Sequence, residues 1–189
     1  MGIINHIDTL YSANKFRCQK KESSFIAFST LNYYYKINFS NRITDKIWLG
    51  NYADSSNENF IKNNNIKVII NCSKDLPFYF NNQEVAYKYR IPVDDDRQEN
   101  SLYTMYLYLP KIVDIIKFHI KRNENIYVHC HAGMQRSACV VAAYLMAQYN
   151  MKHTDAIKYI KNHRPIAFSP FTNFEKSLIH YYNILNKNS

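Results

Sequence analysis

The sequence predicts an α/β fold: one domain with a central, mostly parallel, twisted sheet of about five strands flanked by helices on both faces. Short runs rich in β-branched and aromatic residues alternate along the chain with longer runs of helical periodicity. Such alternation is typical of a layered α/β domain. The length of 189 residues suits a single core, and the hydrophobic content of 47% is enough to fill one.

The predicted strands are short segments in which β-branched and aromatic residues dominate. They cover residues 34–38, 46–49, 67–71, 87–91 and 126–129. The last of these is the apolar run Ile-Tyr-Val-His, which comes directly before a cysteine.

The predicted helices cover residues 58–64, 102–121, 136–149, 155–162 and 171–185. In the second helix the apolar residues fall on one face; they are Leu102, Met105, Leu109, Val113, Ile116 and Ile120. Pro110 lies inside this pattern and should kink the helix or split it in two. Ser169 and Pro170 predict an N-cap and a first-turn proline for the last helix.

Residues 1–40 are predicted to be an N-terminal extension, and residues 41–186 to be one domain. Within the extension, Ile3, Ile7 and Leu10 recur at helical spacing, so we expect a short amphipathic helix there. The chain contains no internal repeat, long linker or low-complexity tract.

Residues 129–137 read His-Cys-His-Ala-Gly-Met-Gln-Arg-Ser and are the most informative segment of the chain. Cys130 should end a strand, and Arg136 should open the following helix. A loop between them can point its backbone N–H groups at an anion, which the helix N-terminus also favours. Gly133 suits the left-handed position that such a loop needs. The segment therefore predicts a phosphate-binding loop made of His131, Ala132, Gly133, Met134, Gln135 and Arg136.

The side chains of this segment suit metal-independent attack on a phosphate ester. A free thiol has a pKa of about 8.5, which helix N-termini and nearby cations lower to about 3.5–7.5. Cys130 would have both neighbours, so we expect a thiolate nucleophile. Arg136 offers a planar fork that fits two phosphate oxygens, and Ser137 can donate a hydrogen bond to the sulfur.

The pattern His-Cys-x-x-Gly-x-x-Arg-Ser resembles the signature of the cysteine-dependent protein tyrosine phosphatase superfamily. Residues 48–51 (Trp-Leu-Gly-Asn), 91–95 (Ile-Pro-Val-Asp-Asp), 143–146 (Ala-Tyr-Leu-Met) and 169–170 (Ser-Pro) resemble segments of its dual-specificity branch, in the same order. The resemblance covers about residues 41–186. It implies hydrolysis of phosphotyrosine and phosphoserine/threonine in proteins through a phosphocysteine intermediate, without a metal or another cofactor.

The leaving oxygen needs a proton, and a carboxylic acid on a neighbouring loop can supply it, which contributes about 10²–10⁴-fold to the rate. Asp94, Asp95 and Asp96 are the candidates. Alignment with the family segment favours Asp95, with Asp96 and then Asp94 as alternatives. The two that are not the acid would be solvated loop charges or would cap the following helix.

Three further residues have roles that the resemblance suggests. His129 would hydrogen-bond inside the loop, tune the cysteine and transfer no proton. His131 would add positive charge at the rim when protonated, or would be an exposed residue without a role. Cys72 ends the strand at 67–71; in some relatives a cysteine there forms a reversible disulfide with the nucleophile, whereas otherwise it is a small buried residue.

One segment departs from the family pattern. Many dual-specificity phosphatases carry Ser-Pro-Asn before the last helix, but this chain has Ser169-Pro170-Phe171, and Asn173 follows two residues later. The family asparagine, which would position a water or a loop, therefore has no direct counterpart at residue 171.

Other functions fit the residues less well. A metal site made of His129, Cys130 and His131 would need neighbouring strand residues, which point to opposite faces, to converge, so we expect no metal. A sulfur transferase would give no reason for Arg136 and Ser137. Lipid phosphatases of the superfamily usually carry lysines in the loop, and residues 131–135 contain none. An RNA 5′-phosphatase and a phosphate-binding pseudoenzyme or scaffold remain the alternatives.

The net charge of +9 would attract a phosphorylated protein and is also compatible with nucleic acid. The basic residues are scattered, however, and we interpret them mainly as solvated: Lys20, Lys21, Lys121, Arg122, Lys158, Lys161 and Arg164. We therefore expect no membrane partner, and the net charge alone does not exclude nucleic acid. The N-terminal extension would shape the substrate groove, mediate a homodimer or pack on its own domain.

We expect the protein to act in the cytoplasm. The four cysteines show no disulfide framework, a thiolate enzyme needs a reducing compartment, and no signal peptide is evident. The abundance of Asn, Ile, Lys and Tyr suggests an AT-rich genome, as in some large DNA viruses, so a viral protein in its host cell or virion is one option.

Overall fold

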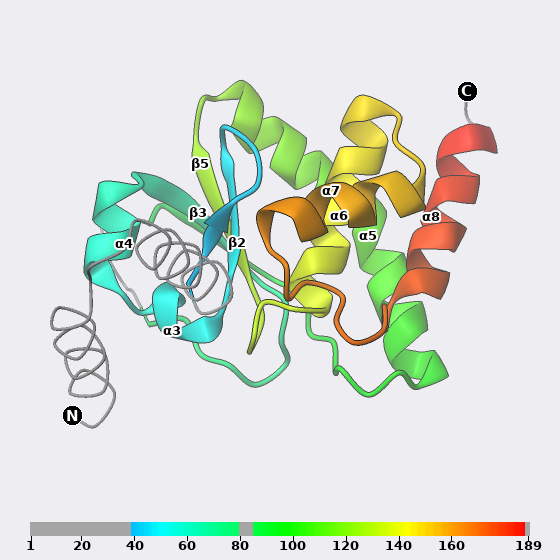
Figure 1. Ribbon diagram of the computed structural model, residues 1–189. Coiled ribbons are helices and arrows are strands. Elements are labelled where there is room, and N and C mark those ends of the chain that lie inside the picture. Colours follow the sequence, from blue (N-terminus) through cyan, green and yellow to red (C-terminus); the bar gives the residue numbers. More distant parts are fainter. Residues whose placement is uncertain (1–38, 80–84, 188–189) are drawn as a thin grey trace, which may run out of the picture. The chain divides into compact units, whose positions relative to one another are not determined.

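A sheet of five strands in the order β1-β2-β5-β3-β4 lies at the centre of the structure, a computed structural model that describes residues 39–79 and 85–187 (Figure 1). The strands are β1 (Asn41–Arg42), β2 (Ile47–Gly50), β3 (Ile66–Asn71), β4 (Tyr87–Arg90) and β5 (Asn125–His129). β1 pairs antiparallel with β2, and every other pair is parallel. The predicted mostly parallel α/β sheet is therefore confirmed.

Four predicted strands correspond to β2, β3, β4 and β5. β1 was not predicted, because it has only two residues, both polar. The predicted strand at 34–38 and the predicted helix near the N-terminus lie outside the described residues.

Both faces of the sheet are buried, as is usual for parallel strands. Successive side chains alternate between the faces. One face carries Ile47, Leu49, Val68, Ile70, Ile126 and Val128 and belongs to the larger core cluster. The other face carries Trp48, Ile69 and Tyr127, which form a smaller cluster with Ile61.

Helices cover both faces (Figure 1). The short α3 (Tyr52–Ser55) and α4 (Glu58–Asn63) lie on one face, and the larger α5 (Glu99–Lys121), α6 (Arg136–Tyr149), α7 (His153–His163) and α8 (Glu175–Lys187) lie on the other. α6 packs on β5 and is itself covered by α5, α7 and α8. Its residues 137–146 are all buried, which explains why this segment is apolar on every side.

Of the two outcomes predicted for Pro110, the split is excluded, because α5 runs unbroken from Glu99 to Lys121. The prediction for the last helix needs correction: α8 begins at Glu175, so Ser169 is not its N-cap and Pro170 is not in its first turn. The reason is a contact from elsewhere in the chain: the side-chain amide of Gln135 donates to the carbonyls of Ser169 and Phe171 and holds this segment as a loop.

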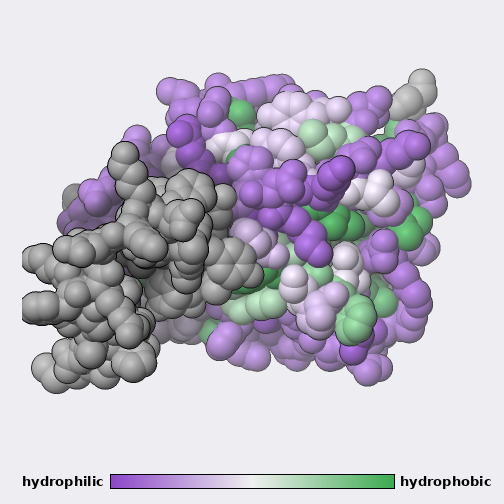
Figure 2. Space-filling model, in the orientation of Figure 1, coloured by the Kyte–Doolittle hydropathy of each residue, from purple (hydrophilic) through white to green (hydrophobic). Residues whose placement is uncertain are grey.

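Figure 2 shows hydrophilic residues over most of the coloured part of the surface in that view, with smaller groups of hydrophobic residues between them. Phe171, beside the loop just described, is one of the exposed large hydrophobic residues. No helix within the described residues has the length and apolarity needed to cross a membrane.

Candidate active site

Cys130 lies directly after β5, which is flanked by β2 and β3 and so occupies the middle of the sheet. In open α/β sheets, ligands bind at the carboxyl ends of the strands. The thiol is buried, and the hydroxyl of Ser137 in the first turn of α6 donates a hydrogen bond to its Sγ at 3.3 Å. The strand and the helix thus fix both ends of the predicted phosphate-binding loop.

The loop between them is fixed by hydrogen bonds from other segments to its backbone carbonyls. Four consecutive carbonyls, those of residues 131–134, each accept a hydrogen bond from outside the loop at 2.7–3.0 Å; the donors are the backbone N–H groups of Tyr52 and Phe168 and the guanidinium of Arg164. In a trans peptide the N–H points away from the C=O. The N–H groups of residues 132–135 therefore face the opposite side, where they can converge on an anion.

The prediction that Arg164 is a solvated basic residue is wrong. The residue is fully buried, and its guanidinium donates to the carbonyls of Gly133, Ala132 and Phe39 and to Oδ1 of Asn41. Burial lowers its pKa, but an arginine remains protonated in proteins. A second positive charge therefore lies behind the loop.

Gly133 has a φ of +68°, as predicted for this loop, and packs against the end of β2. A Cβ at Gly133 would lie 2.2 Å from the carbonyl oxygen of Gly50. A Cβ at Gly50 would in turn lie 1.8 Å from Oγ of Ser40. Gly133 is thus required by the close approach of the loop to the end of β2, and Gly50 by the close approach of the Ser40 side chain.

Two of the three candidate acids are engaged elsewhere. Oδ2 of Asp94 lies 3.6 Å from Nζ of Lys74, and this ion pair is about half exposed. Oδ1 of Asp96 accepts the backbone N–H of Gln98, the residue before α5, at 3.0 Å. This bond and one from the hydroxyl of Ser101 lower the pKa of Asp96. Asp94 therefore matches the predicted alternative of a solvated loop charge, whereas Asp96 accepts the N–H of Gln98, the N-cap residue of α5, and this helix has no side-chain cap hydrogen bond.

Asp95 instead faces the phosphate-binding loop. Its Oδ2 lies 3.5 Å from Nε of Arg136, and its Oδ1 accepts a 2.8 Å hydrogen bond from Nδ2 of Asn173. The carboxylate is about three-quarters covered, with 26% of the side chain exposed. Of the three aspartates, Asp95 has the geometry of a proton donor to a group bound by Arg136.

His129 and His131 differ in environment. His129 is buried and stacks on Tyr127, with ring centroids 5.5 Å apart and planes inclined by 14°. Burial lowers its pKa to about 4, so the ring is neutral near physiological pH. Since strand side chains alternate, it lies on the face opposite Cys130 and is not placed to transfer a proton. His131 is exposed at the loop.

Cys72 follows β3 beside the Cys130 strand. Its backbone N–H donates to the carbonyl of His129 at 2.7 Å, and its thiol belongs to the same buried cluster as Cys130. Burial raises the pKa of Cys72 well above the usual value, and the Cys130 charge adds to this. Cys72 is therefore a protonated thiol beside the candidate nucleophile.

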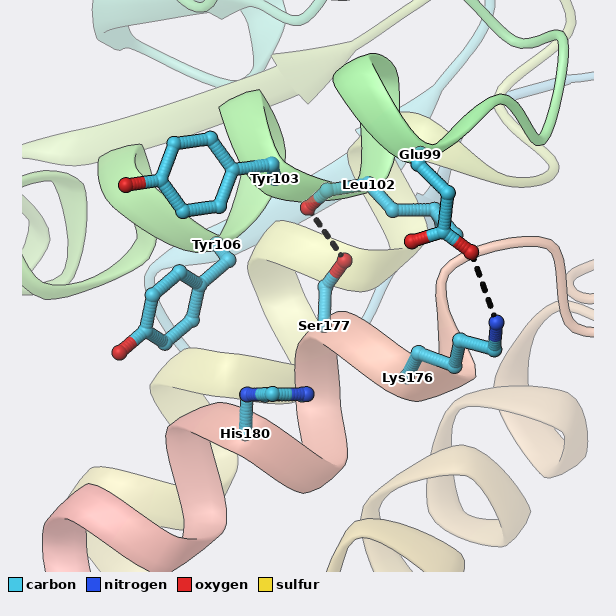
Figure 3. A pocket seen from close by; sticks show the side chains of 7 residues that line it. All are labelled: Glu99, Leu102, Tyr103, Tyr106, Lys176, Ser177 and His180. Carbon is cyan, nitrogen blue, oxygen red and sulfur yellow. Dashed lines mark hydrogen bonds and ion pairs between the residues drawn. The ribbon is translucent and has the colours of Figure 1, made fainter.

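A hollow lies away from the phosphate-binding loop. It is a groove of about 160 Å³ between α5 and α8, lined by Glu99, Leu102, Tyr103, Tyr106, Lys176, Ser177 and His180 (Figure 3). Two of its polar side chains bond within the groove: Lys176 binds Glu99 at 2.9 Å, and Ser177 donates to the carbonyl of Leu102 at 2.8 Å. Nowhere in residues 39–79 and 85–187 do three or more His, Cys, Asp or Glu residues form a group that could hold a metal ion.

Comparison with known proteins gives consistent matches. A family model described as "Dual specificity phosphatase, catalytic domain" matches residues 47–184. Tyrosine-protein phosphatase vhp-1 of Caenorhabditis elegans is 33% identical over 145 residues, which cover 77% of this chain and 21% of that protein. Dual specificity protein phosphatase 6 of Homo sapiens is 32% identical over 144 residues, which cover 76% of this chain and 36% of that protein. The chain thus spans about a fifth to about a third of the length of these curated relatives.

Solved structures agree with the observed fold. The crystal structure of DUSP15 is 25% identical with a TM-score of 0.67, over 80% of this chain and 97% of that chain. The crystal structure of human DUSP28 is 24% identical with a TM-score of 0.68, over 78% of this chain and 95% of that chain.

Proposed function

The chain belongs to the dual-specificity phosphatase family, and on this basis we propose that it hydrolyses phosphotyrosine and phosphoserine/threonine in proteins through a phosphocysteine intermediate. The observation that carries the proposal is the loop that begins at Cys130. It combines a buried thiol, a ring of backbone N–H groups and the guanidinium of Arg136, while Ser137 donates to the sulfur.

The reaction has two steps. The Cys130 thiolate attacks phosphorus, the bond to the leaving oxygen breaks, and Asp95 gives that oxygen its proton. The loop N–H groups and Arg136 bind the non-bridging oxygens as charge redistributes. A water then attacks the phosphocysteine, Asp95 takes up the proton of that water, and Cys130 leaves as a thiolate stabilised by Ser137.

A phosphoprotein substrate fits the loop better than the alternatives do. Residues 131–135 carry no lysine, which argues against a phosphoinositide. Arg136-Ser137-Ala138 differs from the Arg-Thr-Gly that RNA 5′-phosphatase relatives favour. A pseudoenzyme is disfavoured because a thiol, an arginine and an acid meet at one site.

Hydrolysis of an aryl phosphate, with and without EDTA, tests the proposal directly. We expect turnover that EDTA does not change and that Cys130→Ser abolishes. The substrate class is then tested with phosphotyrosine and phosphothreonine peptides against a 5′-triphosphate RNA. Turnover that survives Cys130→Ser, or that requires a metal, would overturn the proposal, and preferential hydrolysis of the RNA would replace the substrate class.

The proposal also covers domain organisation and location. Residues 41–186 would be the catalytic domain and residues 1–40 an extension, and the protein would act in the reducing cytoplasm, where the thiol stays free. A chain that begins at Phe39 should keep aryl phosphatase activity. Activity of the full chain should fall during storage without reductant and return when reductant is added.

Cys72 is proposed as a redox partner of the nucleophile. Peroxide would oxidise the Cys130 thiolate to a sulfenic acid, and the Cys72 thiol would then attack it, forming the disulfide and releasing water. A thiol reductant would restore both cysteines. Peroxide-treated protein should contain a Cys72–Cys130 cross-linked peptide by mass spectrometry, and Cys72→Ser should make inactivation irreversible. Absence of the cross-link in inactivated protein would contradict this role.

A further inference from the structure

The side chain of Gln135, the last residue before α6, leaves the phosphate-binding loop and binds the backbone of the loop at 169–173. Its Nε2 donates to the carbonyls of Ser169 and Phe171 at 3.0 and 2.7 Å, and its Oε1 accepts the backbone N–H of Asn173 at 3.1 Å. The residue is only 5% exposed. Both N–H groups of the amide and its oxygen are therefore used to fix one backbone segment.

The side chain of Asn173 continues this connection to the candidate acid. Its Nδ2 donates to Oδ1 of Asp95 at 2.8 Å, while Oδ2 of Asp95 lies 3.5 Å from Nε of Arg136. Gln135 and Arg136 are neighbours in the chain. The phosphate-binding loop is therefore linked to the 169–173 loop through Gln135, that loop is linked to Asp95 through Asn173, and Asp95 contacts Arg136 of the phosphate-binding loop.

The two contacts of Asp95 are expected to change differently when the substrate binds. Arg136 is needed by the phosphate, so a bound substrate competes with Asp95 for the guanidinium. Asn173 is uncharged and has no such competitor. An amide N–H can also donate to the carbonyl oxygen of a protonated acid, so this contact persists when Asp95 carries the proton that it must deliver.

The geometry also separates the two oxygens of the carboxyl group. Oδ1 is occupied by Asn173, and Oδ2 faces Arg136 and hence the bound phosphate. We propose that Asn173, fixed by Gln135, is a positioning residue that keeps Oδ2 of Asp95 directed at the leaving oxygen. This inference rests on the proposed function, and it gives a role to the asparagine that stands two residues from its usual place.

Leaving-group dependence tests the proposal, because only a poor leaving group needs the proton. We measure kcat/KM, which reports the first step, with phenyl phosphate and with 2,4-dinitrophenyl phosphate. Asn173→Ala should lower kcat/KM about tenfold for phenyl phosphate, as expected for loss of a hydrogen bond to a carboxylate. For 2,4-dinitrophenyl phosphate the change should stay within about twofold, since this leaving group departs without a proton.

Matched variants separate positioning from folding. Thr172→Ala, at the neighbouring residue, should leave kcat/KM unchanged for both substrates. Asn173→Asp keeps the shape of the side chain but places a second carboxylate against Asp95. It should therefore lower kcat/KM for phenyl phosphate at least as much as Asn173→Ala does. Competitive inhibition by tungstate, a probe of the anion site alone, should be retained in Asn173→Ala, Asn173→Asp and Thr172→Ala.

A double-mutant cycle gives the sharpest readout. If Asn173 acts through Asp95, Asn173→Ala should have no further effect on phenyl phosphate in an Asp95→Ala background. An equal loss on both substrates, or an additional loss in that background, would overturn the inference while Cys130-dependent turnover still supports the function. Turnover that is independent of Cys130 would instead overturn the proposed function, and the inference with it.

Discussion

The phosphate-binding loop, residues 130–136, and the acid loop, residues 92–98, meet at one site but are built in different ways. In the first, Cys130 and Gly133 are buried and four consecutive carbonyls are fixed by groups from other segments. In the second, most residues are exposed, and Asp95 is held through the side chains of Asn173 and Arg136. The difference indicates that the proposed anion site is part of the core, whereas the position of the proposed acid depends on a few contacts at the surface.

Removing the nucleophile should separate chemistry from anion binding most strongly. Cys130→Ser should lower kcat by about 10⁴-fold or more, because the hydroxyl is a far weaker nucleophile than a thiolate. Tungstate binding, measured by calorimetry, should persist, because the loop is fixed by its carbonyl contacts and not by the sulfur. Loss of tungstate binding in a folded Cys130→Ser protein would show that the loop is not preorganised.

Removing the acid should lower the rate of the reaction and leave substrate binding intact. Asp95→Ala should lower kcat for phenyl phosphate by about 10²-fold, the lower end of the range for general acid catalysis, with little change in KM. Asp94→Ala is the matched control, since Asp94 pairs with Lys74. An equal loss for Asp94→Ala and no loss for Asp95→Ala would reverse the assignment.

Arg164→Met tests whether the phosphate-binding loop depends on the core. It should lower the free energy of unfolding by about 3 kcal/mol, because several buried carbonyls lose their donor. Lys161→Met, on the exposed side of α7, should change it by less than about 0.5 kcal/mol. Urea unfolding of both variants checks this, and equal effects would contradict the view that Arg164 supports the loop.

Titration of His129 gives the smallest expected effect. Its pKa is lowered from 6.5 to about 4 in the folded chain, so the unfolded chain binds more protons between these values. The stabilisation is complete above pH 6.5 and is lost as the pH falls toward 4. From pH 7.5 to pH 5 this should cost about 2 kcal/mol, measured as the difference between the wild type and His129→Gln in urea unfolding. The same pH dependence in both proteins would contradict it.

The parts of the molecule that local patterns determine were predicted well. The strand before Cys130, the α6 helix and the left-handed glycine all depend on residues that are neighbours in the chain. Asp95 was favoured from its place in a family segment, and its direction toward Arg136 supports that choice.

The residues that the sequence did not reveal act across long chain separations. Arg164 reaches Gly133 across 31 positions, and Asn173 reaches Asp95 across 78 positions. Periodicity and composition do not predict such contacts, and they do not distinguish a buried arginine from an exposed one. The start of α8 was misplaced for the same reason, because Gln135 determines it from 34 positions away.

Arg164 has a practical consequence for anyone who shortens this chain. Two of its four acceptors, the carbonyl of Phe39 and Oδ1 of Asn41, belong to the segment that leads into β1. Removal of residues 1–41 would leave part of the guanidinium unpaired inside the protein, directly behind the predicted phosphate-binding loop. Expression boundaries should therefore keep Phe39, and labels or fusion partners joined just before it need a spacer.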